Sequence, residues 1–250
     1  MSTWLFDLGN TRLKCAPLRA DGRLGAVRAL VHDEGEAWLQ ALPSGAVACI
    51  ASVASEARRV ALLEALLPRF ARIHLVATEA ALGPLRIAYP APQRLGVDRF
   101  LAMLGQCDGQ AVLVVGVGTA LTLDLVDAAG RHRGGRIAPS PQLMRQALHA
   151  RAAQLPERGG AYAEFADDTA AALASGCEGA ALALIERSLH AARDLLGGCR
   201  RCACTAAVAR RCARSCRRMP GCRMRCCRGW RAGTRCGSHK LRRCRCAPPS

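Results

Sequence analysis

Apolar and polar positions along residues 1–198 follow two alternating periods. Short apolar runs bounded by Gly, Pro or charged residues predict strands. The predicted strands are residues 4–8, 11–18, 46–52, 73–77, 111–115 and 120–126. Apolar residues spaced three or four positions apart predict helices at 56–70, 96–107, 141–152 and 168–196. Strands that alternate with helices in this way are typical of an α/β fold.

Two of these helices have an apolar face that can be read from the spacing. On the first it consists of Val60, Leu63, Leu66 and Leu67. On the long Ala/Leu-rich helix it consists of Leu173, Cys177, Ala181 and Leu184. These side chains are predicted to pack against a sheet.

The chain contains a weak internal repeat. Residues 7–11 and 116–120 are both expected to form a strand, a glycine-containing polar turn and a returning strand, about 110 residues apart. This predicts two related lobes, at residues 1–108 and 109–198, followed by a separate tail at 199–250.

The net charge of +17 comes almost entirely from the tail. Residues 199–250 contain 15 Arg, one Lys and no acid, whereas the first 198 residues hold 20 basic and 19 acidic residues. Nucleic acid is therefore not an expected partner of the body. The body has no apolar run that we expect to cross a membrane, and its first residues have no basic segment typical of a signal peptide, so we expect a cytoplasmic protein.

Cysteine and histidine give no ligand pattern in the body. Its four cysteines are most simply buried thiols: Cys15, Cys49, Cys107 and Cys177. The six histidines, at positions 32, 74, 132, 149, 190 and 239, are dispersed. This dispersion predicts neither a metal site nor a catalytic triad.

The first segment with chemical potential is the run from Asp7 to Lys14, with sequence DLGNTRLK. Gly9 lets backbone N–H groups approach a phosphate, Lys14 adds a positive charge, and an Asp at a strand end suits hydrated Mg²⁺. The alternative is a hairpin turn that binds nothing.

The second segment is Gly96-Val97-Asp98-Arg99. Asp98 has the chemistry of a general base for a hydroxyl group, and Arg99 that of a clamp for a carboxylate. The alternative is a helix cap beside a surface ion pair.

A third segment runs from Gly116 to Asp124, with sequence GVGTALTLD, and is followed by the pair Gly134-Gly135. It could cradle the far end of a triphosphate, or it could be a tight hairpin in a buried sheet.

Together, in this order and spacing, the three segments resemble the signature of the type III pantothenate kinases over residues 4–196. The resemblance implies an actin-like, ribonuclease H-like fold with two duplicated lobes, an active site between them and a homodimer. It implies ATP-dependent phosphorylation of pantothenate to 4′-phosphopantothenate, the first step of coenzyme A biosynthesis, with Mg²⁺ as cofactor.

The resemblance also assigns roles to residues. Asp98 would be the base and Arg99 would hold the pantothenate carboxylate. The ATP and Mg²⁺ contacts would come from Asp7, Leu8, Gly9, Asn10, Thr11, Arg12, Leu13, Lys14 and Thr119. The pantothenate contacts would come from Tyr89, Gly96, Val97, Asp98, Arg99 and Thr169. Thr169 could equally serve in the first turn of the long helix, and the two roles are compatible.

One position departs from the family pattern. Gly116 stands where the family usually has an Asp that helps to hold a monovalent cation, K⁺ or NH₄⁺. Gly has no carboxylate, so the potassium requirement is in doubt unless Asp124 or backbone carbonyls replace the ligand.

The tail holds 11 of the 15 cysteines and shows no helix or strand periodicity. One interpretation is a zinc- or polyanion-binding tail, although the Cys spacings do not repeat. A disulfide scaffold is a second, which a cytoplasmic body argues against. A third is a shifted reading frame near residue 198 in a GC-rich gene, which the coding sequence would reveal. The tail is then expected to be disordered or misfolded and to leave sheet surface uncovered, with weak ATP binding and low stability.

Two other readings of the whole chain remain. The body could be an actin-like kinase for another small hydroxy acid. It could also be an inactive kinase-like body that carries a basic, Cys-rich binding tail.

Overall fold

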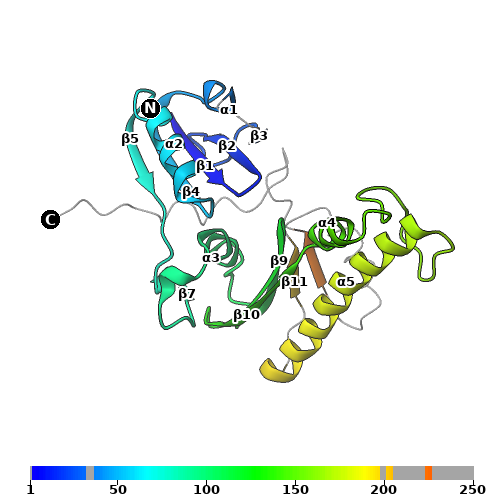
Figure 1. Ribbon diagram of the computed structural model, residues 1–250. Coiled ribbons are helices and arrows are strands. Elements are labelled where there is room, and N and C mark those ends of the chain that lie inside the picture. Colours follow the sequence, from blue (N-terminus) through cyan, green and yellow to red (C-terminus); the bar gives the residue numbers. More distant parts are fainter. Residues whose placement is uncertain (1, 32–36, 198–200, 205–222, 227–250) are drawn as a thin grey trace. The chain divides into compact units, whose positions relative to one another are not determined.

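The computed structural model describes residues 2–31, 37–197, 201–204 and 223–226 of the 250-residue chain (Figure 1). Strands and helices alternate, so the predicted α/β fold class is confirmed. The described residues form two compact units. The first unit comprises residues up to 79 together with 91–101, and the second comprises 80–90 together with the residues from 102 onward.

The first unit is built on a five-stranded sheet with the order β3-β2-β1-β4-β5. Its strands are β1 Thr3–Leu8, β2 Arg12–Leu18, β3 Arg28–Val31, β4 Gly45–Ser52 and β5 Phe70–Leu75. β1, β2 and β3 are antiparallel neighbours, whereas β4 pairs parallel with both β1 and β5. The helical elements are α1 Ala37–Gln40, α2 Glu56–Leu66, the 3-10 turn η1 Pro92–Arg94, and the start of α3 Val97–Leu104.

Helix α2 buries only part of the predicted face, through Leu66 and the partly buried Leu63. Leu62 and Leu66 are fully buried in the core that Phe6 and Phe70 share, whereas Val60 and Leu67 are exposed. The helix ends at Leu66, and its contact line runs through positions 62 and 66, one turn apart. The prediction followed the apolar residues alone and so placed the face on the wrong side at Val60 and Leu67.

The second unit repeats the sheet. Its strands are β8 Val112–Val117, β9 Ala120–Val126, β10 His132–Pro139, β11 Arg201–Cys204 and β12 Arg223–Cys226, in the order β10-β9-β8-β11-β12. As in the first unit, three antiparallel strands are followed by two parallel ones. The other elements are the short strands β6 Ala81–Leu82 and β7 Leu85–Arg86, and the helices α4 Pro141–Arg151 and α5 Thr169–Leu196. The matching strand orders confirm the internal repeat.

Two short segments of the tail, β11 and β12, form strands that the sequence did not predict. Cys202 and Ala203 of β11 are fully buried, and Cys202 joins the core formed by β8, β9 and α5. Small side chains fit beside β8 without a period-two pattern, so this part of the β8 edge is paired. The other predictions about the tail fall on residues 199–200, 205–222 and 227–250, which lie outside the described residues.

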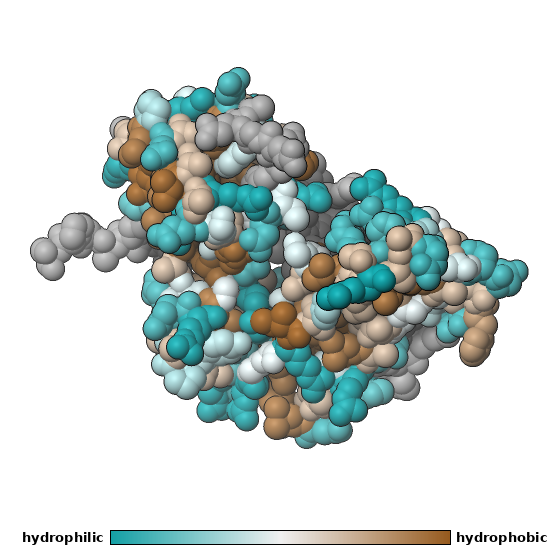
Figure 2. Space-filling model, in the orientation of Figure 1, coloured by the Kyte–Doolittle hydropathy of each residue, from teal (hydrophilic) through white to brown (hydrophobic). Residues whose placement is uncertain are grey.

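Helix α5 is the longest element, and its core face agrees with the prediction at Leu173, Cys177 and Ala181. Ile185 is the next buried residue, while Leu184 is partly buried. By length and hydropathy alone α5 could cross a membrane, although the sequence analysis expected no such run. A core helix of a soluble protein passes the same test. One face of α5 is buried, and its residues Ala181 and Ile185 belong to the core of the second sheet. Pale and brown residues, mixed with teal ones, follow α5 on the surface drawn in Figure 2.

Candidate functional site

The segment from Asp7 to Lys14 is the hairpin between β1 and β2. Leu8 and Leu13 pair across the strands and are fully buried, which anchors the turn in the core. Gly9 closes the turn by donating its N–H to the Arg12 carbonyl at 3.1 Å. Three polar residues are thereby exposed at the tip: Asn10, Thr11 and Arg12.

Asp7 lies just before this turn, where its carboxylate interacts with the charges of Lys14 and Asp98. Its carboxylate is 3.7 Å from the Lys14 Nζ, directly across the strands. Burial raises the pKa of Asp7, the Asp98 carboxylate raises it further, and Lys14 partly opposes both. The Asp7 and Asp98 carboxylates are thus close enough to repel each other, and a cation between them would reduce that repulsion.

Asp98 stands in the first turn of α3 and is exposed. Its Oδ1 accepts the Arg99 N–H at 2.8 Å, which turns the carboxylate back toward Gly96. A Cβ at Gly96 would lie only 2.6 Å from that oxygen, so a larger residue there would displace the Asp98 carboxylate. Just upstream, Thr78 Oγ1 donates to the Leu95 carbonyl at 2.8 Å and fixes the entry to the helix.

Arg99 and Val97 differ from Asp98 in being buried. The first unit therefore combines the exposed Asp98 carboxylate with an exposed polar turn and the lysine-paired carboxylate of Asp7. These groups suit the deprotonation of a hydroxyl group and the binding of a cation with phosphate.

The third segment forms the β8–β9 hairpin of the second unit. Gly116 pairs with Thr122 inside the sheet, and Gly118 donates to the Ala120 carbonyl at 2.9 Å. Thr119 is exposed at the turn, and its carbonyl accepts the Ser140 N–H at 3.4 Å. Ser140 in turn caps α4 through the Leu143 N–H.

The other two predicted residues of this unit occupy separate elements. Thr169 is the exposed first residue of α5, and Asp168 is the N-cap, accepting the Ala171 N–H at 2.9 Å. Tyr89 follows β7 and is half-buried, with its ring stacked on His132 at a centroid distance of 5.9 Å.

Sequence reasoning missed the partnership of His132 with Asp124. His132 Nε2 lies 3.1 Å from Asp124 Oδ1, and both side chains are almost completely buried. The available signal was Asp124 itself, an acid within an apolar strand, because a buried carboxylate requires a partner. The prediction that the histidines are dispersed therefore overlooked a buried pair, although the two residues form no triad.

Of the two cations expected from the sequence, Mg²⁺ has a suitable ligand among the described residues, whereas the monovalent cation lacks its usual one. In the described part of the chain no cluster of three His, Cys, Asp or Glu residues could hold a metal ion. Mg²⁺ keeps several waters and needs few carboxylates, so Asp7 is sufficient as its protein ligand. A monovalent cation does not fit at Gly116, which has no donor side chain, and the Asp124 carboxylate is engaged inward by His132.

Comparisons with known proteins identify the family to which this chain is similar. Residues 4–191 match the family model described as type III pantothenate kinase. The type III pantothenate kinase of Stenotrophomonas maltophilia strain K279a is 58% identical over 201 residues, covering 79% of this chain and 82% of the relative. That of Xanthomonas campestris pv. campestris strain B100 is 60% identical over 200 residues, covering 78% and 82%.

Solved structures show the same fold at low identity. A Campylobacter jejuni protein described as a Baf family transcriptional activator is 17% identical, with a TM-score of 0.55 over 89% of this chain and 90% of that chain. A Sinorhizobium meliloti protein described as a 2-dehydro-3-deoxygalactonokinase is 12% identical, with a TM-score of 0.54 over 89% and 92%. The duplicated actin-like kinase fold is thereby confirmed, and the chain belongs to the type III pantothenate kinase family.

Proposed function

We propose that this chain transfers the γ-phosphoryl group of ATP to the primary hydroxyl of pantothenate, the first step of coenzyme A biosynthesis. The observation that carries the proposal is the exposed Asp98 carboxylate, held by the Arg99 N–H at the start of α3 and over Gly96. Family membership supplies the substrate class.

The transfer is direct and in line. The pantothenate hydroxyl oxygen forms a bond to the γ-phosphorus as the bond from that phosphorus to the β,γ-bridging oxygen breaks, and ADP leaves. Asp98 accepts the hydroxyl proton, and Arg99 holds the substrate carboxylate. Gly96 and Val97 complete this substrate segment, with Tyr89 and Thr169 as further pantothenate contacts.

The phosphate side depends on the turn of the β1–β2 hairpin. Its exposed Asn10 and Thr11 are free of the core, and Gly9 brings the backbone close to the surface, as phosphate binding requires. The ATP contacts are Asp7, Leu8, Gly9, Asn10, Thr11, Arg12, Leu13 and Lys14, with Thr119 of the second hairpin. Asp7 would hold Mg²⁺, which would supply charge neutralisation on the phosphate oxygens.

The monovalent-cation site of the family lacks its usual side-chain ligand in this chain. Gly116 offers no carboxylate, and Asp124 Oδ1 lies against His132. Any K⁺ or NH₄⁺ here would depend on backbone carbonyls, so we expect stimulation by these ions to be weak.

The protein works in the cytoplasm as a homodimer. Within the described part of the chain, Cys15 and Cys177 are buried thiols, which suits a reducing compartment. Exposed large apolar side chains of the second unit supply surface for a second copy: Ile137, Leu143, Leu148, Phe165 and Leu195.

The test is ATP-dependent phosphorylation of pantothenate by the purified chain, its Asp98→Asn variant and the control Asp21→Asn. Asp21 is an exposed turn residue of the same unit. We expect Asp98→Asn to lower kcat about 10³-fold, as loss of a general base does, and Asp21→Asn to leave it unchanged. A variant Asp98→Asn that keeps a tenth of the wild-type kcat would rule out the assigned role.

A further inference from the structure

The second unit contains a buried polar pair that the phosphoryl transfer does not use. His132 is the first residue of β10, and its side chain is completely buried. Its Nε2 meets the buried Asp124 carboxylate at 3.1 Å. An ionised carboxylate only accepts hydrogen bonds, so Nε2 carries the proton, which fixes both the tautomer and the plane of the imidazole ring.

The face of that ring is covered by Tyr89. The two ring planes are 21° from parallel, and the centroids are 5.9 Å apart. Tyr89 is only half-buried, so part of its side chain lies at the surface of the second unit. The histidine thus supports an aromatic residue that is not itself enclosed in the core.

The backbone segment before Tyr89 is hydrogen-bonded to the turn that precedes His132. Arg86 donates its N–H to the Gly130 carbonyl at 3.0 Å. Gly130 has φ +81°, and a Cβ there would lie 2.1 Å from the Pro84 carbonyl oxygen. The segment 84–89, which we call the strap, therefore rests directly on the turn at residues 127–130.

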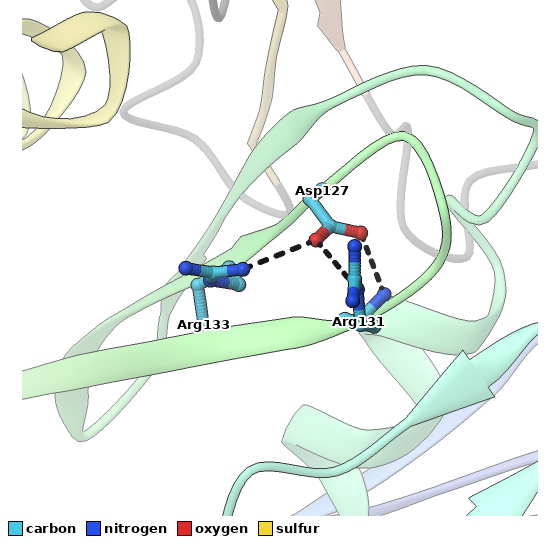
Figure 3. A network of polar contacts seen from close by, with 3 residues as sticks. All are labelled: Asp127, Arg131 and Arg133. Carbon is cyan, nitrogen blue, oxygen red and sulfur yellow. Dashed lines mark hydrogen bonds and ion pairs between the residues drawn. The ribbon is translucent and has the colours of Figure 1, made fainter. Parts of the chain in front are cut away.

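That turn is in turn held by a network of charges. Asp127 accepts the Arg131 N–H at 2.9 Å and pairs with the Arg131 Nε at 3.2 Å and an Arg133 Nη at 3.5 Å (Figure 3). Gly130 also donates its N–H to the Asp127 carbonyl at 3.0 Å. The turn is fixed on both sides of the point where the strap attaches.

The choice of histidine has a cost that packing alone does not explain. Among the described residues, the His132 Nδ1 is buried and has no hydrogen-bond partner. A phenylalanine could stack on Tyr89, but it would take the His132 Nε2 donor away from the buried Asp124 carboxylate, which is unfavourable. The histidine therefore both pairs with Asp124 and provides the fixed ring against which Tyr89 lies.

We infer that His132 is a positioning residue for pantothenate binding, acting through Tyr89. Held by Asp124, it sets the orientation of the Tyr89 ring, while the strap sets the position of its backbone. The inference rests on the proposed function, in which Tyr89 contacts pantothenate. It assigns to His132 no contact with substrate and no part in proton transfer.

The test is a double-mutant cycle on His132→Leu and Tyr89→Leu, with KM for pantothenate, KM for ATP and kcat measured separately. We expect His132→Leu to raise the pantothenate KM about tenfold and to leave the ATP KM within about twofold. In the Tyr89→Leu background the same change should add less than about twofold, because coupled residues are not additive. His74→Leu, a partly buried strand histidine of the first unit, is the matched control and should leave all three parameters unchanged.

Parallel rises in both KM values, or additive effects, would mean that His132 is only structural and would overturn the inference. If His132→Leu does not fold, His132→Phe takes its place in the cycle, since it keeps the stacking and loses only the Asp124 bond. Its expected pantothenate KM lies between those of wild type and Tyr89→Leu, and an unchanged KM would also overturn the inference.

Failure of the proposed function gives a different pattern. If the wild type binds pantothenate in calorimetry but does not phosphorylate it, the proposed reaction fails, and the same cycle in Kd decides the role of His132. If the wild type does not bind pantothenate, both are overturned.

Discussion

The β1–β2 and β8–β9 hairpins occupy the same place in the two sheets. The first has a charged pair, Asp7 and Lys14, next to its turn, whereas the second has the uncharged Gly116 and Thr122 at the same position. Asp7 and Gly116 are each the fifth residue of a six-residue strand, and each strand is the first in sequence of its five-stranded sheet. Asp7 faces Lys14 across the hairpin, whereas Gly116 faces Thr122. One backbone arrangement thus serves two chemistries, and the side chain at this single position decides which of them a hairpin supports.

The strands that complete each sheet differ as well. In the first unit, β4 and β5 are eight and six residues long and contribute Ala48, Ile50 and Phe70 to the core. In the second unit, β11 and β12 have four residues each, and β11 supplies the buried Cys202 and Ala203. The second sheet is therefore completed by shorter strands than the first, although its strand order is the same.

The largest expected effect on kcat comes from removing the carboxylate of the first hairpin at Asp7, compared with adding one to the second hairpin at Gly116. Asp7→Asn should lower kcat by about 10²- to 10³-fold, because loss of the carboxylate removes the Mg²⁺ ligand. Gly116→Asp should change kcat by less than about threefold without added salt and should introduce stimulation by K⁺. Steady-state rates in K⁺ and in tetramethylammonium buffers measure both. Equal loss in the two variants would break the assigned difference between the hairpins.

The next effect tests whether β11 closes the second sheet. Ala203 is fully buried, so Ala203→Glu should destabilise the fold by about 3 kcal/mol, the usual result of burying an unpaired charge. The control Ala81→Glu places the same side chain on an exposed strand, opposite Arg86, and should cost almost nothing. Urea unfolding compares them, and indistinguishable midpoints would argue against a buried β11.

A smaller effect is expected at the turn that supports the strap. Gly130→Ala combines a positive φ with a clash against Pro84, and should cost about 2 kcal/mol. Gly22→Ala has a similar φ of +77° but open space around it, and should cost about 1 kcal/mol. The difference between their thermal midpoints isolates the contact. If Gly130→Ala is the milder of the two, the strap does not rest on that turn.

The smallest effect is electrostatic and depends on pH. Burial raises the pKa of Asp127, but the hydrogen bonds and charge of Arg131 outweigh burial and bring the pKa below 3.8. The depressed pKa contributes stability above pH 3.8 that is lost as the pH falls through the folded-state pKa. Asp127→Asn should therefore cost about 1 kcal/mol at pH 7. The difference from wild type should disappear at more acid pH, and a difference that persists there would point to packing instead.

Sequence patterns were sufficient for the parts of the fold that local chemistry determines. The hairpin at Asp7–Lys14, the α3 start at Asp98 and the core face through Cys177 all follow from residue type and spacing. The face of α2 did not, because Val60 and Leu67 are apolar but lie on the side that tertiary packing leaves exposed.

Two features could not be predicted because they depend on residues distant in sequence. Cys202 forms a buried strand only because β8 provides a hydrogen-bonding edge from residues about 90 positions earlier. The contact of Tyr89 with His132 requires the strap to reach the turn at Gly130, and no local period encodes that contact.

The position of Asp7 has a consequence for selection. Its pKa is raised chiefly by burial. The ionised form that holds a cation at neutral pH therefore lowers the free energy of unfolding of the ligand-free protein. This loss of stability disappears only as the pH falls through the folded-state pKa. A library screened for heat resistance alone would thus favour neutral residues here and discard working enzymes, whereas one screened with nucleotide and Mg²⁺ present would retain the aspartate.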